Sequence, residues 1–506
     1  MKLLSLRLCD HDSNMSYFDG NSVRYYKSER SKKIKHHGYN NLWEWEPEAQ
    51  RVFDFDINEI DEIAIVLDPW KHNLPADQET FFPSESYNKY FPARCDVTRV
   101  NHHYAHALGC WVVSDTEDFD FAIVIDGWGD LDISWSVFSQ HSMIDIGTMK
   151  EHGSIGEEMA QAGRWLGIEA ACSVDLAGKV MGIQAYGNYD QGFYDHLREY
   201  DMRTVYKIFD RDDWSRYNGN STLANLTPLN WIRTVHQIVG EKIVDFFFDF
   251  VKSSDKILYS GGVAQNVIWN TELKKHFPNL VIPPCCNDEG LSLGGLEYLR
   301  KKHNLPKFEI NNFPYAQSDM APTSEASEET IKRAARDLAN GKTVGWYQGN
   351  GEIGPRALGN RSILMDARIP NAKDVINKIK KRETYRPFGA SILLEFSSEY
   401  FDGLPENPYM LYVGKFKEGK VIPGVCHIDN TCRVQTVDKN GGLFRRLLEE
   451  FYSLTKCPLL LNTSMNVAGE PLAGVPEDAH RVFNETELDV NVIGDLYYDK
   501  TRFSLG

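Results

Sequence analysis

The sequence has no long apolar run, no paired-cysteine motif and no low-complexity tract. No stretch approaches the roughly 20 apolar residues that cross a membrane, so we predict no membrane partner. The nine cysteines are scattered, Cys285 and Cys286 form the only close pair, and no CxxC occurs. This odd, scattered set predicts reduced thiols in a cytoplasmic protein. The opening MKLLSLRLCDHDS is interrupted by an arginine and predicts a β-strand rather than a signal peptide.

An excess of basic residues is also missing. The 55 Lys and Arg face 72 Asp and Glu, and the net charge is −17. A strongly acidic chain repels polyanions, so bulk binding to nucleic acid is disfavoured. Net charge does not exclude a local basic site for a nucleotide or a phosphate. We find no internal sequence repeat of 20–50 residues.

The 506 residues, 42% of them hydrophobic, are enough for two or three domains with separate cores. The stretch FPYAQSDMAPTSEASEE, from Phe313 to Glu329, is rich in Pro, Ser, Ala and acidic residues and lacks periodicity. Such a composition is typical of a linker. We therefore place a first domain at 1–315, a linker at 316–328 and a second domain at 329–506.

Short apolar runs alternate with helical patterns in both halves, which favours an α/β fold for each. Thr234–Phe250 has the apolar spacing of a long amphipathic helix. The expected strands are Ile63–Leu67, Phe121–Ile125, Lys256–Tyr259, Thr343–Tyr347, Ser391–Leu394 and Leu459–Leu461.

Three histidines in NHHYAHA form the first candidate site. His102 and His106 are four residues apart, so on a helix they share one face and can bind one metal ion. A histidine pair alone is more often packed or exposed than metal-bound. Two carboxylates strengthen the metal interpretation: Asp126, at the end of an apolar strand, and Asp288, before a small-residue helix start.

Glycine turns follow two of the expected strands. Asp126 and Gly127 end one strand, and Gly261 and Gly262 end another. Glycine turns between a strand and a helix expose backbone N–H groups that bind phosphates, whereas an isolated Asp-Gly is usually an ordinary turn. Near the N-terminus, HDS (His11–Ser13) and a later basic run containing His36 place acidic, hydroxyl and basic groups at strand ends, which suits phosphate chemistry.

The second half contains basic residues beside Gly, Pro and Asn turns. Convergent guanidinium and ammonium groups with amide and hydroxyl donors are suited to a small phosphorylated ligand. The alternative is four unrelated surface clusters. The candidate residues are Arg356, Lys380, Arg386, Arg433, Asn462, Ser464 and Asn466.

The order of these motifs resembles a known family. HDS, ER…KHHG, NHHYAHA, VIDGWGD, AGKVMGIQAYG, SGGVAQN and NDEG are followed by GPRALGNRS, KKRETYRPF, TCRVQTV and LLNTSMNVAGEP. This order resembles the O-carbamoyltransferases of nodulation-factor and aminoglycoside biosynthesis, from about residue 9 to about residue 475. HDS replaces the usual HDA, NTSMN replaces NTSFN, and the stretch 189–230 carries no motif.

The resemblance implies an actin/Hsp70-like (ASKHA) ATPase-fold first domain, similar to the threonylcarbamoyl-transferring enzyme of tRNA modification, and a YrdC-like second domain. It implies an iron or similar divalent metal ion on His102, His106 and Asp288, with Asp126 facing a metal or a nucleotide. It also implies ATP, Mg²⁺ and carbamoyl phosphate as ligands. The cofactor contacts expected in the first half are Asp12, Ser13, Asp126, Gly127, Lys179, Gly261, Gly262 and Asn266.

The predicted activity is ATP-dependent O-carbamoyl transfer through a carbamoyl-adenylate. Lys380 and Arg433 are the predicted catalytic groups of activation, and His11 or His36 is the predicted base toward the acceptor hydroxyl. The acceptor class stays open between a natural product, a sugar and a hydroxymethylated nucleotide, and a homodimer is left open. The alternatives are a tRNA-type threonylcarbamoyl transferase and an ASKHA-fold kinase.

Overall fold

The computed structural model describes residues 1–39, 43–68, 95–140, 142–209, 226–318, 321–322 and 324–500. These residues pack as two compact units. Unit 1 comprises 1–9 and 60–308, and unit 2 comprises 10–59 and 309–506. Residues 10–59 therefore group with the C-terminal half of the chain. The domain boundaries 1–315 and 329–506 stay a prediction, and residues 319, 320 and 323 of the expected linker lie outside the described residues.

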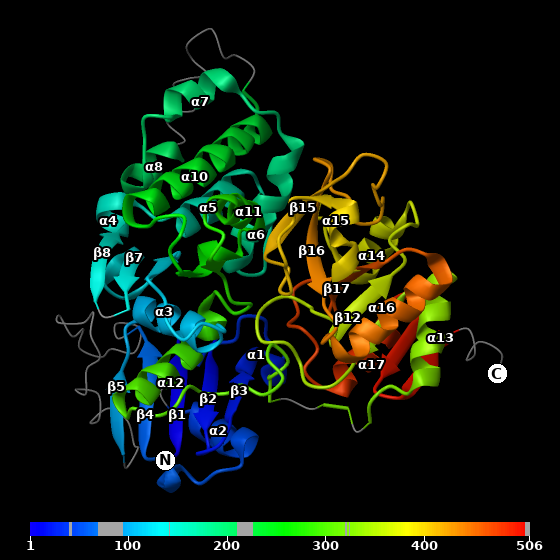
Figure 1. Cartoon of the computed structure of the whole chain (residues 1–506), viewed down its shortest axis with the longest axis horizontal. Coiled ribbons are helices and arrows are strands. Elements are labelled where there is room, and N and C mark those ends of the chain that lie inside the picture. Colours follow the sequence, from blue (N-terminus) through cyan, green and yellow to red (C-terminus); the bar gives the residue numbers. More distant parts are fainter. Residues whose placement is uncertain are drawn as a thin grey trace. The chain divides into compact units, whose positions relative to one another are not determined.

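Two five-stranded sheets have the same strand order, and Figure 1 labels all five strands of the first. In the first, β3-β2-β1-β4-β5, the strands are Leu3–Leu8, Asn14–Phe18, Val23–Lys27, Glu62–Leu67 and Asp96–Arg99 for β1 to β5. In the second, β10-β9-β6-β7-β8, they are Phe121–Ile125, Ile133–Ser139, Met143–Thr148, Ile257–Ser260 and Leu280–Val281 for β6 to β10.

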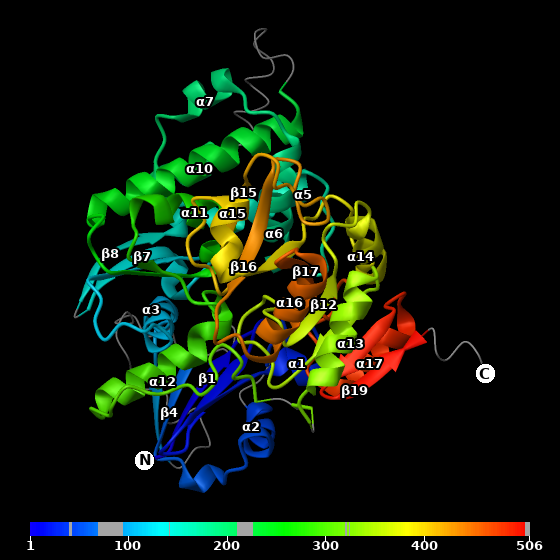
Figure 2. The same cartoon turned by 45° about the vertical axis from the view of Figure 1, so that its right-hand side comes forward.

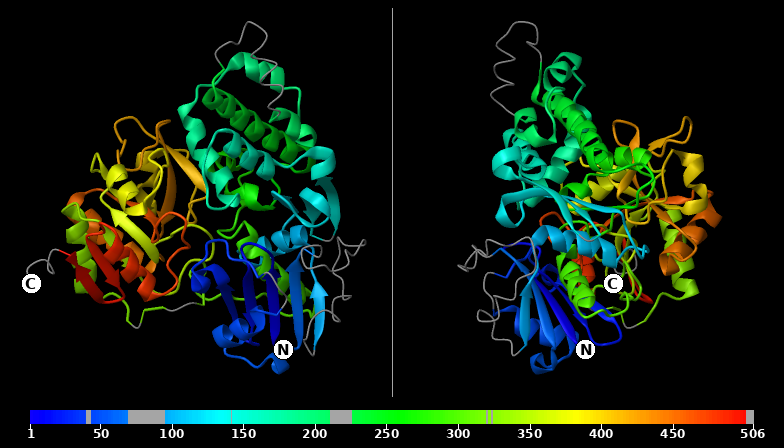
Figure 3. Two further views of the ribbon diagram at one scale, coloured as in Figure 1. Left: turned by 180° about the vertical axis from the view of Figure 1, so that it is seen from behind. Right: turned by 60° about the vertical axis from the view of Figure 1, so that its left-hand side comes forward.

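In both sheets the earliest strand lies at the centre, with the second and third strands on one side and the fourth and fifth on the other. Strands β1, β4 and β5 run parallel (Figure 3), as do β6, β9 and β10. This duplicated order is that of the actin/Hsp70-like ATPase fold and confirms the predicted fold class. The repeat is invisible in the sequence because a sheet requires apolar alternation, not identical residues.

The helices of unit 1 are α3 His102–Val112, α4 Met149–His152, α5 Ile155–Trp165, α6 Val174–Ile183, α7 Gln191–Leu197, α8 Val205–Ile208, α10 Pro228–Phe250, α11 Val267–His276 and α12 Leu291–Lys302. Helix α12 packs on β1 and β4, and α3 packs on α12 and on β6 and β9. Helix α12 therefore contacts strands of one sheet and α3 strands of the other, and the histidine motif forms the start of α3.

Unit 2 is built on a nine-stranded mixed sheet, ordered β14-β15-β16-β13-β17-β12-β11-β18-β19. From β11 to β19 the strands are Val344–Tyr347, Arg361–Met365, Gly389–Leu393, Phe401–Asp402, Tyr412–Phe416, Thr431–Val437, Leu459–Ser464, Val490–Ile493 and Leu496–Asp499. Its helices are α1 Ser28–Lys32, α2 Trp45–Phe53, α13 Glu328–Ala339, α14 Ala372–Lys380, α15 Ser397–Tyr400, α16 Gly442–Thr455 and α17 Pro476–Glu485. Helices α13 and α16 lie side by side (Figure 2).

All six expected strands and the long helix are present, displaced by at most a few residues at their ends. The long helix begins earlier than predicted, at Pro228, because the Thr227 side chain caps it and proline is favoured in a first turn. Within the expected linker, Gln317 is fully buried, and its side chain accepts a hydrogen bond from the Lys27 N–H at 3.1 Å. Among the described residues, no helix has the length and apolar character that crossing a membrane requires.

Candidate metal centre and basic cluster

The histidine motif forms the first turns of α3. The Asn101 side chain caps the helix by accepting a hydrogen bond from the Tyr104 N–H at 3.1 Å. The His102 N–H donates to Asp130 at 3.0 Å, and Asp130 is paired with buried Arg99 at 2.6 Å. His102 and His106 therefore project one helical turn apart from a fixed and buried helix start.

Asp126 follows β6, and its two carboxylate oxygens make different contacts. Oδ1 accepts hydrogen bonds from the N–H groups of Gly127 at 2.7 Å and Gly262 at 2.9 Å. Oδ2 lies 3.0 Å from Nε2 of both histidines. Two glycine turns predicted to contact a nucleotide thus orient this carboxylate, and the nucleotide contact itself stays a prediction.

Gly261 is the position in this turn where only glycine fits. Its φ is +95°, and a Cβ there would lie 2.2 Å from the Ile125 carbonyl oxygen. A side chain would therefore push apart the ends of β6 and β9, which carry Asp126 and the second glycine turn.

Asp288 begins a short 3₁₀ turn, Asp288–Gly290, that leads into α12. Its Oδ2 accepts a hydrogen bond from the fully buried Arg7 guanidinium at 2.9 Å. Its Oδ1 lies 3.5 Å from His102 Nε2 and 3.4 Å from His106 Nε2. Arg7 therefore turns one oxygen away and leaves the other facing the histidines.

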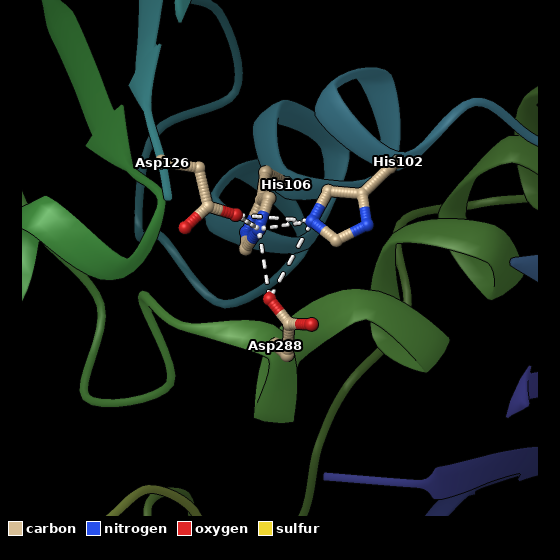
Figure 4. A group of neighbouring side chains, drawn as sticks. All are labelled: His102, His106, Asp126 and Asp288. Atoms are coloured by element: carbon tan, nitrogen blue, oxygen red, sulfur yellow. Dashed lines mark hydrogen bonds and ion pairs between the residues drawn. The ribbon is translucent and has the colours of Figure 1, made fainter. Parts of the chain in front are cut away.

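Four side chains converge in this way on one point (Figure 4). Two imidazoles, which bind metals in their neutral form, and two carboxylates are a donor set found in iron and zinc sites of proteins. Spacings of 3.0–3.5 Å between ligand atoms fit one shared ion at about 2.0–2.2 Å from each atom. We call His102, His106, Asp126 and Asp288 the metal centre; all four were predicted from the sequence, and their metal binding stays a proposal.

The charges of the metal centre are mutually dependent. Burial lowers the pKa of His102, but the Asp288 charge and hydrogen bonds with both carboxylates outweigh it and raise that pKa to about 10. Burial raises the pKa of Asp126, but hydrogen bonds with the histidines hold it well below its usual range. His103 differs: its Nδ1 bonds Ser136 at 2.9 Å, and burial lowers its pKa to about 3, so the third histidine is neutral and structural.

Gly294 allows α12 to approach α3, and this contact carries a prediction. A Cβ there would lie 1.9 Å from the Ala105 carbonyl oxygen, inside van der Waals contact. We expect Gly294→Ala to lower the free energy of unfolding by about 3 kcal/mol, because the helices must separate. We also expect loss of bound metal, since Asp288 moves with α12; chemical unfolding and elemental analysis measure the two effects.

The matched control is Gly178, an exposed glycine inside α6 with no atom within 4 Å of its added Cβ. Gly178→Ala should stabilise the protein by about 0.5–1 kcal/mol, because alanine lowers the entropy cost of the helix. Equal effects of the two substitutions would contradict the close-approach argument.

A second charged group lies in unit 2, in residues 10–59. Asp12 is buried and contacts His36, His11 and Lys27. Ser13 is also buried, and its hydroxyl oxygen accepts a hydrogen bond from the Tyr39 N–H at 3.1 Å. The structure therefore brings together all four predicted residues of this region.

The predicted basic residues of the C-terminal half also come together in unit 2. Lys380, at the end of α14, is buried, and its ammonium group donates to the Ser464 hydroxyl at 2.9 Å and to the Asn466 side chain. Burial lowers the pKa of Lys380 well below its usual value, and the nearby Arg382, Arg386 and Lys35 charges lower it further. The lysine at the end of α14 thus contacts the end of β17 and is surrounded by further positive charges.

Arg433 adds to this field. Burial lowers its pKa below the usual value, and so do the charges of Arg356, Arg382 and Arg386. Arg433 Nε is buried and donates no hydrogen bond to any of the described residues. Concentrated positive charge in a chain of net charge −17 indicates an anion site. We call Lys380, Arg356, Arg382, Arg386 and Arg433 the basic cluster.

Three residues predicted to contact a cofactor form hydrogen bonds within the fold. Lys179 donates to the Glu169 carbonyl at 2.5 Å. Asn266 caps α11 through its carbonyl oxygen and bonds His236 at 3.0 Å through its amide nitrogen. Asn462 donates to Ser391 at 2.9 Å, and its carbonyl oxygen has no partner among the described residues. Their cofactor roles stay predictions.

Sequence reasoning missed three residues of these sites. Arg7 contacts Asp288, Lys27 contacts Asp12, and Arg382 belongs to the basic cluster. Arg7 interrupts the otherwise apolar strand LLSLRL, and a charge in a buried strand is a usable signal. Arg382 lies within the quoted motif KKRETYRPF, but no spacing rule separates it from its neighbours.

Unit 1 holds the metal centre and unit 2 holds the basic cluster, two candidate sites of different chemistry. Two known families match parts of the chain. The family described as "Carbamoyltransferase N-terminus" matches residues 80–296, and "Carbamoyltransferase C-terminus" matches residues 335–500.

Two curated relatives agree with this assignment. The nodulation protein NolO of Bradyrhizobium diazoefficiens is 31% identical over 448 residues, which cover 80% of each chain. A 3'-hydroxymethylcephem-O-carbamoyltransferase of Streptomyces clavuligerus is 34% identical over 248 residues, which cover 47% of this chain and 48% of that one. The chain belongs to the O-carbamoyltransferase family and is an enzyme, a carbamoyltransferase.

Solved structures are more distant. HypF of T. kodakarensis has a TM-score of 0.41 at 12% identity, over 60% of this chain and 48% of HypF. The fold assignment above rests on the strand order of the two five-stranded sheets.

Proposed function

We propose that this carbamoyltransferase activates carbamoyl phosphate with ATP in unit 2 and transfers the carbamoyl group to a hydroxyl of a small molecule. The observation that carries the activation step is the basic cluster. Lys380 and Arg433 lie close to further guanidinium groups, and such groups need an anion to offset their repulsion. Carbamoyl phosphate and the ATP phosphates supply that anion.

In the proposed activation, carbamoyl phosphate, ATP and water give carbamoyl-adenylate, pyrophosphate and phosphate. Lys380 and Arg433 offset the negative charge that develops on the transferring phosphate oxygens. The Ser464 hydroxyl and the Asn466 amide keep the Lys380 ammonium in place. The fixed positive groups need no rearrangement during the reaction, which is the physical origin of their catalytic effect.

The metal centre is the proposed place of carbamoyl transfer. A bound iron or other divalent ion supplies Lewis-acid polarisation of a carbonyl or phosphoryl oxygen. The protein contributes preorganisation: backbone amides fix Asp126, and Arg7 fixes Asp288. Mg²⁺ accompanies the ATP phosphates. The acceptor is proposed as a small hydroxyl compound because the cephem enzymes that this chain resembles are named for one.

The direct test is product analysis with ATP and carbamoyl phosphate. The proposal requires pyrophosphate that depends on carbamoyl phosphate, and AMP once the carbamoyl-adenylate is hydrolysed or transfers its carbamoyl group. Release of ADP would instead indicate transfer of the terminal phosphate, as in kinases with the same fold, and would overturn the proposal. A screen of hydroxyl compounds by mass spectrometry for the carbamoyl mass gain then identifies the acceptor.

The lowered pKa of Lys380 predicts proton uptake when ATP binds. The bound phosphates favour the charged ammonium group and raise its pKa, so a proton is taken up at any pH between the free and bound values. The affinity for ATP should therefore fall as the pH rises through that window. Isothermal titration over a series of pH values, in buffers of different ionisation enthalpy, locates and measures the uptake.

Lys380→Met is the control for this measurement because it removes the titrating group and keeps much of the side-chain volume. Proton uptake should then disappear from whatever ATP binding remains. Proton release by the unsubstituted protein would contradict the prediction.

A further inference from the structure

Arg356 of the basic cluster lies in the segment between β11 and β12, outside any helix or strand. We call residues 353–360 the Arg356 loop. Two glycines with positive φ, Gly354 at +103° and Gly359 at +120°, flank Arg356 in this loop. Glycine permits such a path but does not fix it, because glycine populates many backbone conformations. The position of the Arg356 guanidinium therefore depends on what else holds the loop.

The Glu352 side chain binds the N–H groups of the Arg356 loop. Glu352 is fully buried, and its Oε1 accepts hydrogen bonds from the N–H groups of Leu358 at 2.8 Å, Asn360 at 2.9 Å and Arg361 at 3.2 Å. Its Oε2 is also buried and has no hydrogen-bond partner among the described residues. A carboxylate oxygen is a stronger acceptor than a neutral one. The carboxylate therefore fixes the end of the loop that follows Arg356.

The carbonyl groups of the same loop are held by other side chains. Gln435 Nε2 donates to the Leu358 carbonyl at 2.8 Å, and the Tyr315 hydroxyl donates to the same carbonyl at 2.9 Å. Asn462 Nδ2 donates to the Ala357 carbonyl at 3.2 Å. Gln435 and Asn462 are buried residues of β16 and β17. The loop is thus tied to the nine-stranded sheet through its carbonyl groups and to Glu352 through its N–H groups.

The charge of Arg356 gives these contacts a physical purpose. Burial lowers the pKa of Arg433, and the Arg356 charge lowers it further, because the two guanidinium groups repel each other. On an unanchored loop a long arginine side chain moves toward water and escapes this repulsion. Bonds between the loop and buried side chains oppose that movement. They keep the positive charge in the basic cluster before a ligand binds, which is the condition for a preorganised anion site.

We propose that Glu352 is a positioning residue that holds Arg356 in the basic cluster for the phosphate groups of the substrate. The inference rests on the proposed function, in which this cluster binds carbamoyl phosphate and ATP. Glu352 contacts the backbone of the Arg356 loop and acts on the substrate only through Arg356. Its effect on the reaction therefore requires the Arg356 guanidinium.

The deciding measurement is a double-mutant cycle followed by carbamoyl phosphate-dependent pyrophosphate formation. Glu352→Gln keeps the side-chain volume and removes the charge of the acceptor. It should lower kcat/KM for carbamoyl phosphate by at least about tenfold, since a displacement of about 1 Å can cost about 100-fold. In the Arg356→Ala background the same substitution should change kcat/KM by less than about twofold, because the group through which Glu352 acts is gone.

The outcomes of the cycle separate three cases. An equal loss in both backgrounds would mean general loosening of unit 2 and would overturn the inference, as would an unchanged kcat/KM in Glu352→Gln. Absence of carbamoyl phosphate-dependent pyrophosphate in the unsubstituted protein would overturn the proposed function instead. If Glu352→Gln does not fold, Glu352→Asp replaces it in the same cycle with the same expected outcome, because it keeps the charge but shortens the side chain.

Hydrogen exchange tests the anchoring without a substrate. In the full-length protein, peptides that cover residues 354–361 should exchange at least about tenfold faster in Glu352→Gln, because three N–H groups lose a charged acceptor. Peptides from α13 should keep their rate. Unchanged exchange at 354–361, or equal acceleration in α13, would overturn the inference.

Asp489→Asn is the matched control. Asp489 Oδ2 accepts hydrogen bonds from the Thr343 N–H at 2.9 Å and the Thr343 hydroxyl at 2.8 Å. Thr343 precedes β11, whereas the Arg356 loop follows that strand. The control therefore weakens the same kind of carboxylate contact at the other end of the strand and should leave kcat/KM within about twofold. A loss equal to that of Glu352→Gln would mean that any anchor of β11 affects the basic cluster, and it would overturn the inference.

Discussion

His106→Ala is expected to abolish metal binding at the proposed metal centre and to lower carbamoyl transfer by about a thousandfold or more. The imidazole Nε2 lies 3.0–3.4 Å from an oxygen of each carboxylate of the metal centre, so its loss opens one side of the ligand set. It also leaves Asp126 and Asp288 facing each other with one histidine between them, and their repulsion works against the folded geometry. Elemental analysis and carbamoyl transfer are the two measurements.

The activation step provides the internal standard for this variant. Carbamoyl phosphate-dependent pyrophosphate formation, which we assign to the basic cluster of unit 2 in the proposed activation, should persist in His106→Ala. His103→Gln is the matched substitution in the same motif, because His103 bonds Ser136 and contributes no ligand atom. It should keep the metal ion, although its burial makes some loss of stability certain. A metal-replete His106→Ala protein would refute the metal centre.

Lys380→Ala will lower carbamoyl phosphate-dependent AMP formation by about 100- to 1000-fold, the cost of removing one preorganised charge from a transition state. Lys380 is the buried ammonium group of the cluster, and its contacts with Ser464 and Asn466 fix its position. Arg433→Ala should act in the same direction. The two substitutions together should cost less than the sum of their separate effects, because both groups act on one anion.

Lys378→Ala is the matched control for Lys380. It removes the same charge from the same helix, but its side chain is 67% exposed and pairs with Glu487 at 2.6 Å. Removing it should leave AMP formation within about twofold, since exposed ion pairs contribute little. Normal AMP formation by Lys380→Ala would refute the assigned activation chemistry, whereas loss in both variants would indicate a long-range electrostatic effect.

The metal centre was predictable because its signals are local. An i, i+4 histidine pair, an aspartate at a strand end and an aspartate before a helix are each visible in the sequence. Their convergence was not, because it depends on the close approach of α3 and α12 at Gly294. The resemblance to a known family supplied that convergence before the structure did.

The role of the glycine turns was predicted only in part. Gly127 and Gly262 do offer their N–H groups to an anion, as a glycine turn predicts. In the structure that anion is the side chain of Asp126. Sequence patterns identify a donor group but not always its partner: Asp126 adjoins Gly127, but it lies more than a hundred residues before Gly262.

The sequence by itself determined the α/β character of both halves, several strands and one long helix, and most residues of both candidate sites, because apolar periodicity, glycine turns and metal-ligand spacing are local properties of a chain. Only the tertiary structure decided which residues act together. It revealed a duplicated sheet order without sequence repetition and grouped residues 10–59 with the C-terminal half. It also brought Arg7 into contact with Asp288, and Asp12 into contact with His36. These pairings join distant segments, and their energies depend on burial and charge that only the folded chain creates.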